Sequence, residues 1–549
     1  MNLIEQIKQA FQANLQKLFG LDEQAVSALS FDLNVDPAKQ QFGDISSNAA
    51  MILAKQLKQN PREVAQKITE SFKYEQVEKL EIAGPGFLNF YLKPEAFQEL
   101  MVQLLEQKEA FFRLPEDIPK QNFNIEFVSA NPTGPLHLGH GRGGILGDVL
   151  ANILQFIGHQ ATREYYINDA GAQIKKLARS FKARCQQAAG KDVAMPEDGY
   201  QGEYLVELAR ETVAEKGPEI IEQPEEFFGL YAEEKMLEAI AKTLSAYGIT
   251  FDVWFSEKKL HTSGAIDAAF KILEKQGFLY EKEGALWFKS TEFGDDKDRV
   301  IKKSSGDLTY VASDIAYMEN KVERGFNHLI MVLGHDHHSY AVRLEGLRQA
   351  LGIKASLDVI LYQLVKMKAS GQQVRMSKRA GNIVTLEGII ETVGKDVARF
   401  FYLNRKADAQ LEFDLDLALK KTEENPVFYV QYAYVRTGSI LQKASSLPEL
   451  QNISPADSKH IAQPEQTLIK KMVSLKQLLE NIGGNYQTHL LTYYVLELAN
   501  TFHSYYSKNR VIVAEKPEQS RARLLLIEQI RDTFGLCLDL LGISKPAKM

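Results

Sequence analysis

The segment Glu126–Leu150 contains two histidines that could bind the phosphates of a nucleotide. His137 and His140 lie three positions apart, with Gly139 between them, at the start of a helix predicted to reach Ile157. The N-terminus of a helix offers unpaired N–H groups and the positive end of its dipole, which both favour an anion. The glycine lets a flat or charged group approach the backbone. This arrangement predicts a site for ATP.

The same glycines permit two other interpretations. Gly139, Gly141 and Gly144 spell G-x-G-x-x-G, the dinucleotide fingerprint, and Glu164 follows at about the expected distance of twenty residues. That fingerprint needs its first glycine in a tight turn directly after a strand, whereas a stretch with two prolines intervenes here. The glycines could also serve only close helix–sheet packing, with the histidines incidental. These alternatives remain open at this point.

A second segment, Arg375-Met376-Ser377-Lys378, could act on phosphate from the other end of the same unit. It lies in a loop after the last predicted strand of the sheet. A lysine on a loop at the carboxyl edge of a sheet can reach the charge that develops on a phosphate. A lone lysine in a polar loop is usually only solvated. This segment therefore indicates a function only because the same chain also contains the histidine motif.

A third cluster, Gly334–His338, has three histidines and Asp336 within five positions. Imidazole and carboxylate groups suit zinc or iron. However, His335 and His337 are too close in sequence to share one helical face, and no further ligand motif is visible. The two cysteines, Cys185 and Cys537, are too few and too distant for a disulfide framework or a cysteine zinc site. We therefore expect no metal site.

The elements that must position these residues alternate between strand and helix. From Asn122 to about Phe400, strands are predicted at 123–127, 162–167, 308–312, 328–333 and 357–366, with helices between them. Such alternation predicts a parallel sheet covered by helices. The acidic segment of about 180–288 is predicted to be a helical insertion. Residues 1–115 are predicted to form a separate α+β unit, and residues 425–549 are predicted to form an all-α bundle.

Composition limits the class of protein. The chain has 549 residues, 45% hydrophobic and 25% charged, which excludes a collagen-like or disordered protein. The net charge of −6 argues against indiscriminate polyanion binding. No apolar run reaches the length of a membrane-spanning helix, and the N-terminus reads as an amphipathic helix rather than a targeting signal. We expect a cytoplasmic protein without a membrane segment.

The pair HLGH and RMSK resembles the HIGH and KMSKS motifs of class I aminoacyl-tRNA synthetases, with Arg375 in place of the first lysine. The finer resemblance is to the arginyl-tRNA synthetase family of bacterial type, and it covers nearly the whole chain. It rests on the strings EFVSANPTGPLHLGHGR, FGDDKDRVIKKSSGDLTYVASDIAY, MSKRAGNIVTL, NPVFYVQYAYVR, FGDISSNAAMILAK and AGPGFLNFYL.

This resemblance implies a Rossmann-like catalytic domain at 116–424, between an N-terminal tRNA-contacting domain at 1–115 and a helical anticodon-binding domain at 425–549. It implies a monomer that uses L-arginine, ATP with Mg²⁺ and tRNA(Arg), with no permanently bound cofactor. The implied catalytic residues are His137, His140 and Lys378. The implied ATP-binding residues are these three with Gly139, Met376, Ser377 and Asp336.

Arginine carries a flat cation, so its pocket needs inward-facing acids. The implied arginine-binding residues are Glu126, Ser129, Asn131, Tyr310, Asp314 and His335. Asp314 could instead be an ordinary first-turn helix acid, and Tyr310 a sheet-face aromatic. Tyr429, Tyr432 and Arg436 are candidates to contact tRNA, since aromatic rings beside a cation can stack on unpaired bases, although simple packing explains most such tyrosines.

Three other functions are less compatible with this sequence. A small-molecule nucleotidyltransferase shares the histidine loop but has no need of the C-terminal helices. A cysteinyl enzyme of the same class would need a zinc site that two distant cysteines cannot build. A protein that only binds RNA would have no use for the histidine loop together with Lys378.

Overall fold

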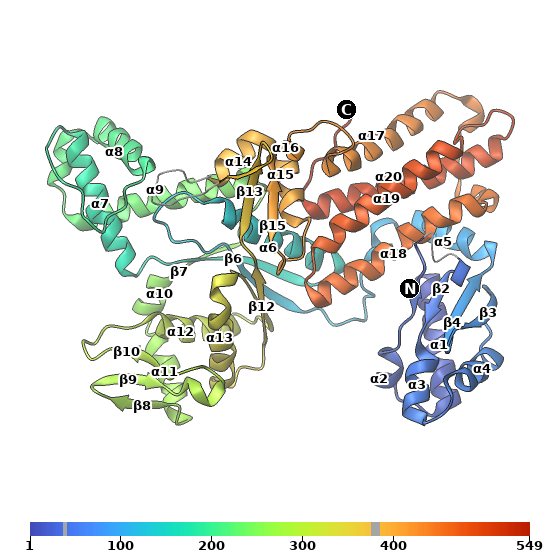
Figure 1. Ribbon diagram of the computed structural model, residues 1–549, viewed down its shortest axis with the longest axis horizontal. Helices are drawn as coiled ribbons and strands as arrows, with labels where there is room; N and C mark the ends of the chain where they lie inside the picture. The colour runs from blue at the N-terminus through green and yellow to red at the C-terminus, as the bar shows by residue number, and fades with distance from the viewer. Residues whose placement is uncertain (37–40, 375–384) are drawn as a thin grey trace.

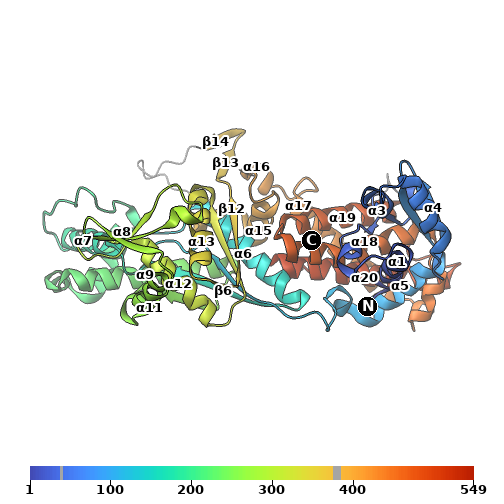
Figure 2. The ribbon, with the colours of Figure 1, turned by 90° about the horizontal axis from the view of Figure 1, so that it is seen from below.

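The computed structural model describes residues 1–36, 41–374 and 385–549. A parallel sheet lies at the centre of the elongated molecule, as Figure 1 shows. Helices α7–α9 and a small sheet lie at one end of the long axis, and the N-terminal unit and the C-terminal helices lie at the other, which the view in Figure 2 also shows. No helix in the described ranges combines the length and apolar character needed to cross a membrane.

The N-terminal unit has helices on an antiparallel sheet of order β1-β2-β4-β3. Its elements are α1 (Leu3–Phe19), α2 (Glu23–Ser27), β1 (Asp32–Leu33), β2 (Ile45–Ser47), α3 (Ala49–Leu57), α4 (Pro61–Ser71), β3 (Val77–Ala83), β4 (Phe87–Leu92) and α5 (Pro94–Gln107). Asn2 caps α1 through a reciprocal pair of hydrogen bonds with Glu5, which satisfies two N–H groups at the helix start. Phe11 and Phe90 meet edge to face in the core between helix and sheet.

The central sheet has five strands in the order β12-β11-β5-β6-β7, all parallel. These strands are β5 (Asn122–Phe127), β6 (Gln160–Ile167), β7 (Val253–Ser256), β11 (His328–Gly334) and β12 (Ser356–Tyr362). Glu126 of β5 lies between Glu164 of β6 and Met331 of β11 in the strand register. Most side chains of β5 are buried, as expected for a parallel strand covered on both faces.

Helix α6 (Leu138–Ile157) crosses this sheet directly after β5, and its glycines set how closely it approaches. A Cβ at Gly143 would lie 2.6 Å from the ring of Tyr362, and one at Gly141 would lie 2.6 Å from Leu386. Larger residues would therefore push the helix away. The helices that follow α6 in the chain, up to β12, are α7 (Ala172–Ala188), α8 (Glu203–Lys216), α9 (Glu225–Ala246), α10 (Glu257–Thr262), α11 (Ala265–Lys275), α12 (Tyr310–Glu323) and α13 (His338–Ala350).

Two smaller sheets flank the central one. The first has the order β10-β9-β8, and the second has the order β14-β13-β15. Their strands are β8 (Leu279–Lys282), β9 (Ala285–Phe288), β10 (Arg299–Lys302), β13 (Val365–Ala369), β14 (Gln372–Val374) and β15 (Leu411–Asp414), and the helices near the second are α14 (Leu386–Val393), α15 (Lys395–Leu403) and α16 (Leu415–Ala418).

The C-terminal part is helical, as predicted. It consists of α17 (Pro426–Ser445), α18 (Gln463–Asn485), α19 (His489–Lys508) and α20 (Pro517–Leu541). Helix α18 also binds the N-terminal unit, because Lys470 Nζ lies 2.9 Å from Asp44 and Lys476 Nζ lies 3.1 Å from Glu5. The fold class predicted from the sequence is confirmed: a parallel sheet with helices, an N-terminal α+β unit and a C-terminal helical bundle.

Three element predictions were wrong in detail. The stretch 308–312 is not a strand, because α12 already begins at Tyr310. The stretch 357–366 is not one strand, since it breaks after Tyr362 and continues as β13 in another sheet. The segment 180–288 is helical only in part, because β7 within it belongs to the central sheet and β8 and β9 to a small one. Strand β7 has four residues, too short for a clear alternating pattern.

Candidate active site

The order of the central sheet defines where a ligand is expected. The chain runs from β5 to β6 on one side, whereas β11 pairs with β5 on the other side. Ligands of such sheets bind at the carboxyl ends of the strands, where the strand order reverses. The loop after β5 carries His137, and the segment after β11 carries His335. The chain thus places both segments at this point.

The two histidines of the first motif stack on each other at the start of α6. Their ring centroids lie 3.7 Å apart, with 23° between the planes. Nδ1 of His137 accepts from the N–H of Gly139 at 3.1 Å, and Nδ1 of His140 accepts from the N–H of His137 at 3.2 Å. In a neutral ring whose Nδ1 accepts, the proton lies on Nε2, from which it can be donated to an oxyanion. A Cβ at Gly139 would lie 2.9 Å from the ring of His137, so the glycine is needed here.

For the second motif, the structure describes only the residues on either side. Arg375, Met376, Ser377 and Lys378 lie outside the described residues. After that interval the chain returns beside the first motif, because Thr385 forms a β-bridge with His137 and the N–H of Leu386 donates to the carbonyl of Leu136 at 2.8 Å.

The backbone after β5 is strained at the site. Val128 and Ser129 have φ values of 66° and 37°, in the left-handed region that β-branched residues avoid. Ser129 Oγ accepts from the N–H of Tyr166 at 3.0 Å and donates to Glu126 Oε1 at 3.3 Å. These bonds hold the turn, and strain held in this way is typical of ligand-binding segments. Asn131, two residues on, is exposed.

Asp314, in the first turns of α12, is an incompletely paired acid. The hydroxyl of Tyr340 donates to its Oδ1 at 2.6 Å, whereas its buried Oδ2 has no hydrogen-bond partner among the described residues. Burial raises the pKa of Asp314 to about 7, and the charges of Glu126 and Glu257 act in the same direction. A cation that reached this oxygen would gain a strong charge-assisted hydrogen bond.

The charge of Glu126 contributes to the raised pKa of Asp314, but Glu126 already has an ion-pair partner. Its side chain is buried, and Oε2 accepts from Lys321 Nζ at 2.6 Å. Lys321 in turn lies 4.3 Å from the ring centroid of Tyr317. A ligand cation would therefore share Glu126 with a protein ammonium group.

Sequence reasoning missed two further acids. Glu257 begins α10 directly after β7 and is buried; its Oε1 accepts from Ser313 Oγ at 2.7 Å, and Oε2 has no hydrogen-bond partner among the described residues. Asp169, just after β6, accepts from the N–H of Lys258 at 2.9 Å. The charges of both acids, with those of Glu126 and Asp314, add to burial in raising the pKa of Tyr166. Glu257 was missed because β7, the strand that it follows, had not been recognised, whereas Asp169 follows a strand that was predicted and could have been found as an acid at its carboxyl end.

Three further residues predicted to bind arginine or ATP are exposed: Tyr310, His335 and Asp336. Tyr310 begins α12 with 58% of its surface exposed, so it is not a sheet-face aromatic. His335 and Asp336 lie in a short 3₁₀ turn after β11, and both are exposed. Across 1–36, 41–374 and 385–549, no group of three or more His, Cys, Asp or Glu side chains is placed to hold a metal ion.

The dinucleotide interpretation does not fit the structure. Glu164, which would bind a ribose, is fully buried, and its carboxylate accepts from Arg324 at 2.6 and 2.8 Å and from Asn124 at 3.0 Å. A Cβ at Gly144 would lie 3.2 Å from Val128, so this glycine serves packing. The glycines of α6 therefore do serve close packing. The histidines nevertheless lie at the start of the helix, where they can bind a ligand.

The candidate tRNA-contacting residues lie along α17. Tyr432 is 40% exposed, and its hydroxyl accepts from Arg436 Nη1. Arg436 also lies 4.6 Å from the ring centroid of Tyr506 on α19. Tyr429 packs beside His503, with 4.9 Å between ring centroids. Tyr432, Arg436 and Tyr506 form a surface that we call the α17–α19 aromatic patch.

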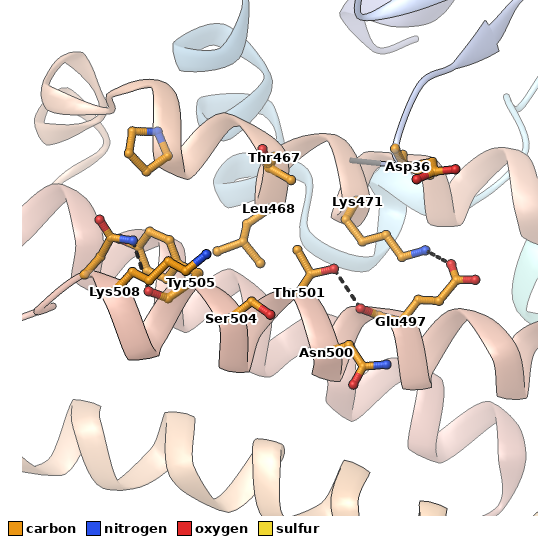
Figure 3. Close-up of a pocket in the computed structure, with 13 residues that line it drawn as sticks. Asp36, Thr467, Leu468, Lys471, Glu497, Asn500, Thr501, Ser504, Tyr505 and Lys508 are labelled. Atoms are coloured by element: carbon orange, nitrogen blue, oxygen red, sulfur yellow. Dashed lines mark hydrogen bonds and ion pairs between the residues drawn. The ribbon is translucent and has the colours of Figure 1, made fainter. Parts of the chain in front are cut away.

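A cavity of about 620 Å³ lies elsewhere, between α18, α19 and the segment Val35–Asp36. In Figure 3 the side chains of Lys471 and Glu497 point toward one another across it, and the Nζ–Oε2 distance is 2.5 Å. This cavity is lined by residues of the helical bundle and the N-terminal unit, and none of the residues predicted from the sequence to be functional lines it.

Three family models match successive parts of the chain. They are described as "Arginyl tRNA synthetase N terminal domain" for residues 5–92, "tRNA synthetases class I (R), catalytic domain" for residues 101–410 and "DALR anticodon binding domain" for residues 430–549. An arginine–tRNA ligase of Desulforamulus reducens is 41% identical over 562 residues, covering 100% of both chains. The chain belongs to the arginyl-tRNA synthetase family.

Two further comparisons agree with membership of the arginyl-tRNA synthetase family. The arginine–tRNA ligase of Citrifermentans bemidjiense is 42% identical over 526 residues, covering 94% of this chain and 95% of that one. The solved arginyl-tRNA synthetase of Thermus thermophilus, at 22% identity, has the same fold with a TM-score of 0.76 over 100% of both chains. The family predicted from the motifs is thus confirmed.

Proposed function

We propose that the chain is an arginine–tRNA ligase that works in two steps. The arginine carboxylate attacks the α-phosphorus of ATP, which forms arginyl-adenylate and expels pyrophosphate. The 2′-hydroxyl of the terminal ribose of tRNA(Arg) then attacks the arginyl carbonyl, and AMP leaves. The observation that carries this proposal is the buried Oδ2 of Asp314, which has no hydrogen-bond partner among the described residues, together with the stacked histidines at the start of α6.

Activation requires charge stabilisation more than a protein base. Nε2–H groups of His137 and His140 would donate to the phosphates of ATP, which arrives with Mg²⁺ as part of the substrate, and Asp336 would bind the nucleotide. Lys378 would stabilise the charge that develops as pyrophosphate leaves, with Met376 and Ser377 beside the nucleotide. Thr385, seven positions after Lys378 in the sequence, forms a β-bridge with His137.

Selection of arginine follows from the acids. A guanidinium would bind Oδ2 of Asp314 and share Glu126 with Lys321, and Glu257 adds negative charge nearby. Ser129, Asn131, Tyr310 and His335 would hold the remainder of the amino acid. A pocket that depends on such hydrogen bonds rejects analogues that lack them by about 10⁴–10⁵.

We assign residues 116–424 to catalysis, residues 1–115 to contact with the body of the tRNA and residues 425–549 to the anticodon. The α17–α19 aromatic patch supports the last assignment, because an arginine over two tyrosine rings, of which Tyr432 is exposed, is suited to unpaired bases. We place the enzyme in the cytoplasm as a monomer.

The test is aminoacylation of total tRNA with each of the twenty amino acids in turn. Arginine alone should become attached to tRNA. Attachment of another amino acid would contradict the proposed specificity. Pyrophosphate release without charged tRNA would favour a small-molecule nucleotidyltransferase instead.

A further inference from the structure

Asp169 is a buried acid that binds the residues on both sides of Glu257. It lies just after β6 and is 6% exposed. Its Oδ2 accepts from Ser256 Oγ at 2.5 Å, and its Oδ1 accepts from the N–H of Lys258 at 2.9 Å. Both oxygens of this carboxylate are therefore bound to the segment where β7 ends and α10 begins.

This contact caps α10 from a different segment of the chain. The hydroxyl of Ser256, the residue before the helix, donates to Asp169, and in the described ranges it makes no side-chain bond to the first helical turn. Asp169 accepts from an N–H of that turn instead, as a helix start requires. Lys258 is held at its other end too, because its Nζ lies 3.0 Å from Glu233 on α9. The first turn of α10 is thus fixed from two directions.

Glu257, the residue between these two bonds, has one carboxylate oxygen bound and one open. It is 4% exposed, and its Oε1 accepts from Ser313 Oγ at 2.7 Å, with His261 Nε2 at 3.6 Å. Its buried Oε2 has no hydrogen-bond partner among the described residues. A buried carboxylate oxygen is costly unless a donor reaches it, so Oε2 indicates where a donor group of a ligand binds.

Ser313 connects Glu257 with Asp314. It immediately precedes Asp314 on α12, and its hydroxyl is the donor to Glu257. Burial raises the pKa of Asp314, and the charge of Glu257 adds to this effect, so the two carboxyl groups lie within electrostatic reach of one another. Each has one buried oxygen that no described residue binds. A guanidinium presents its donors in a planar fork and can bind two carboxylate oxygens at once.

We infer that Asp169 is a positioning residue that holds the first turn of α10, so that Oε2 of Glu257 is presented to the arginine guanidinium together with Asp314. The inference rests on the proposed function, because arginine is the ligand. Asp169 acts through hydrogen-bond geometry and does not itself bind arginine, since both of its oxygens accept from protein donors. A misplacement of about 1 Å in such a site can cost about 100-fold.

The first test compares Asp169→Ala with Asp169→Asn. Asparagine keeps an oxygen that can accept from the N–H of Lys258 and an amide that can donate to the hydroxyl of Ser256, whereas alanine loses both bonds. Asp169→Ala should raise the Kd for arginine, measured by calorimetry, about 10- to 100-fold, and Asp169→Asn less than about fivefold. Equal losses in the two variants would show that the charge matters rather than the geometry, and would overturn the inference.

The second test is a double-mutant cycle with Glu257→Gln, which shows whether Asp169 acts through Glu257. Glu257→Gln alone should raise the Kd about 10- to 100-fold, and in that background Asp169→Ala should add less than about twofold. The same loss in both backgrounds would indicate a general structural role and overturn the inference. The matched control is Asp252→Ala: Asp252 accepts from the N–H of Arg163 at 2.8 Å just before β7, at the opposite end of the strand, and its loss should leave the Kd unchanged.

Amide hydrogen exchange over residues 253–262 tests the cap without arginine. Asp169→Ala should accelerate exchange there and Asp169→Asn should not, so unchanged exchange in Asp169→Ala would refute the inference. If Asp169→Ala does not fold, Ser256→Ala removes one of the two bonds and should raise the Kd about fivefold; a Kd within about twofold of wild type would refute it. Failure of the wild-type enzyme to charge arginine would refute the proposed function instead, and the exchange comparison would still report on the cap.

Discussion

The hydroxyl of Tyr340 donates a 2.6 Å hydrogen bond to Oδ1 of Asp314, and Oδ2 of the same carboxylate has no partner among the described residues. This asymmetry fixes the acid in one orientation and leaves its second oxygen for a ligand. Tyr340, on α13, was not predicted from the sequence to be functional. Its role is to orient Asp314 through this hydrogen bond.

Asp314→Asn should raise the KM for arginine roughly 10- to 100-fold, since one hydrogen bond to a charged group is lost. The value of kcat should fall much less. Steady-state kinetics with arginine varied would measure both constants. Glu319→Gln, an acid-to-amide change on the same helix outside the pocket, is the control. An unchanged KM in Asp314→Asn would remove this residue from the arginine site.

The pH dependence follows from the same carboxyl group, whose neighbours include Tyr340, Arg343, Glu126 and Glu257. Because burial raises its pKa to about 7, arginine binding should tighten as pH rises through 7, and below that pH binding should release a proton. In the ligand-free protein the folded state retains a proton that the unfolded state loses. The contribution of Asp314 to the free energy of unfolding therefore declines between about pH 4 and pH 7.

Calorimetry of arginine binding in buffers of different ionisation enthalpy would measure the released proton. Asp314→Asn should abolish the release and flatten the dependence of stability on pH. Equal proton release by wild type and variant would show that another group titrates.

Glu126→Gln should weaken arginine binding and also destabilise the fold, because Lys321 would lose its buried carboxylate partner. Breaking such a pair costs about 3–5 kcal/mol. The double variant Glu126→Gln, Lys321→Met should recover much of the stability without recovering affinity. Denaturant unfolding and calorimetry would separate these effects. Wild-type affinity in either variant counts against a direct role for Glu126.

Lys378→Ala should lower kcat far more than it changes the KM for arginine, since its proposed interaction exists only in the transition state. Lys366→Ala, on the exposed face of β13, offers a control at the base of the same region. Initial rates of aminoacylation would give both constants. A raised KM with normal kcat would instead assign Lys378 to substrate binding.

Arg436→Ala should raise the KM for tRNA without changing the KM for arginine, because the α17–α19 aromatic patch lies on the C-terminal helices. Loss of one phosphate or stacking contact corresponds to about 1–3 kcal/mol, or roughly 5- to 150-fold. Lys271→Ala on α11 is an exposed control. If both variants bind tRNA(Arg) like wild type in a filter-binding assay, the anticodon contacts must lie elsewhere.

Much of this architecture could be predicted from local sequence. Sequence periodicity strongly predicts long helices such as α6 and α20. A motif whose chemistry needs the start of a helix also predicts where that helix begins. His137 indeed caps α6, and the glycines of that helix pack as expected. The family was also correctly identified, because several long strings occur in the right order.

Other features depended on contacts that local sequence does not encode. Strand β7 is short, so the acid that follows it, Glu257, was overlooked. Tyr310 was placed on a strand because its aromatic character favours strands, but the helix had already begun there. Glu126 and Lys321, which form an ion pair, lie 195 positions apart in the sequence, and no local sequence pattern predicts this contact.

The ion pair between Asp44 and Lys470 joins residues 426 positions apart, and it has a consequence for biosynthesis. At about 5–20 residues per second, the ribosome makes Lys470 about 20–85 s after Asp44. During that interval the nascent N-terminal unit exposes Asp44 and Glu5 without the α18 lysines that pair with them in the folded protein.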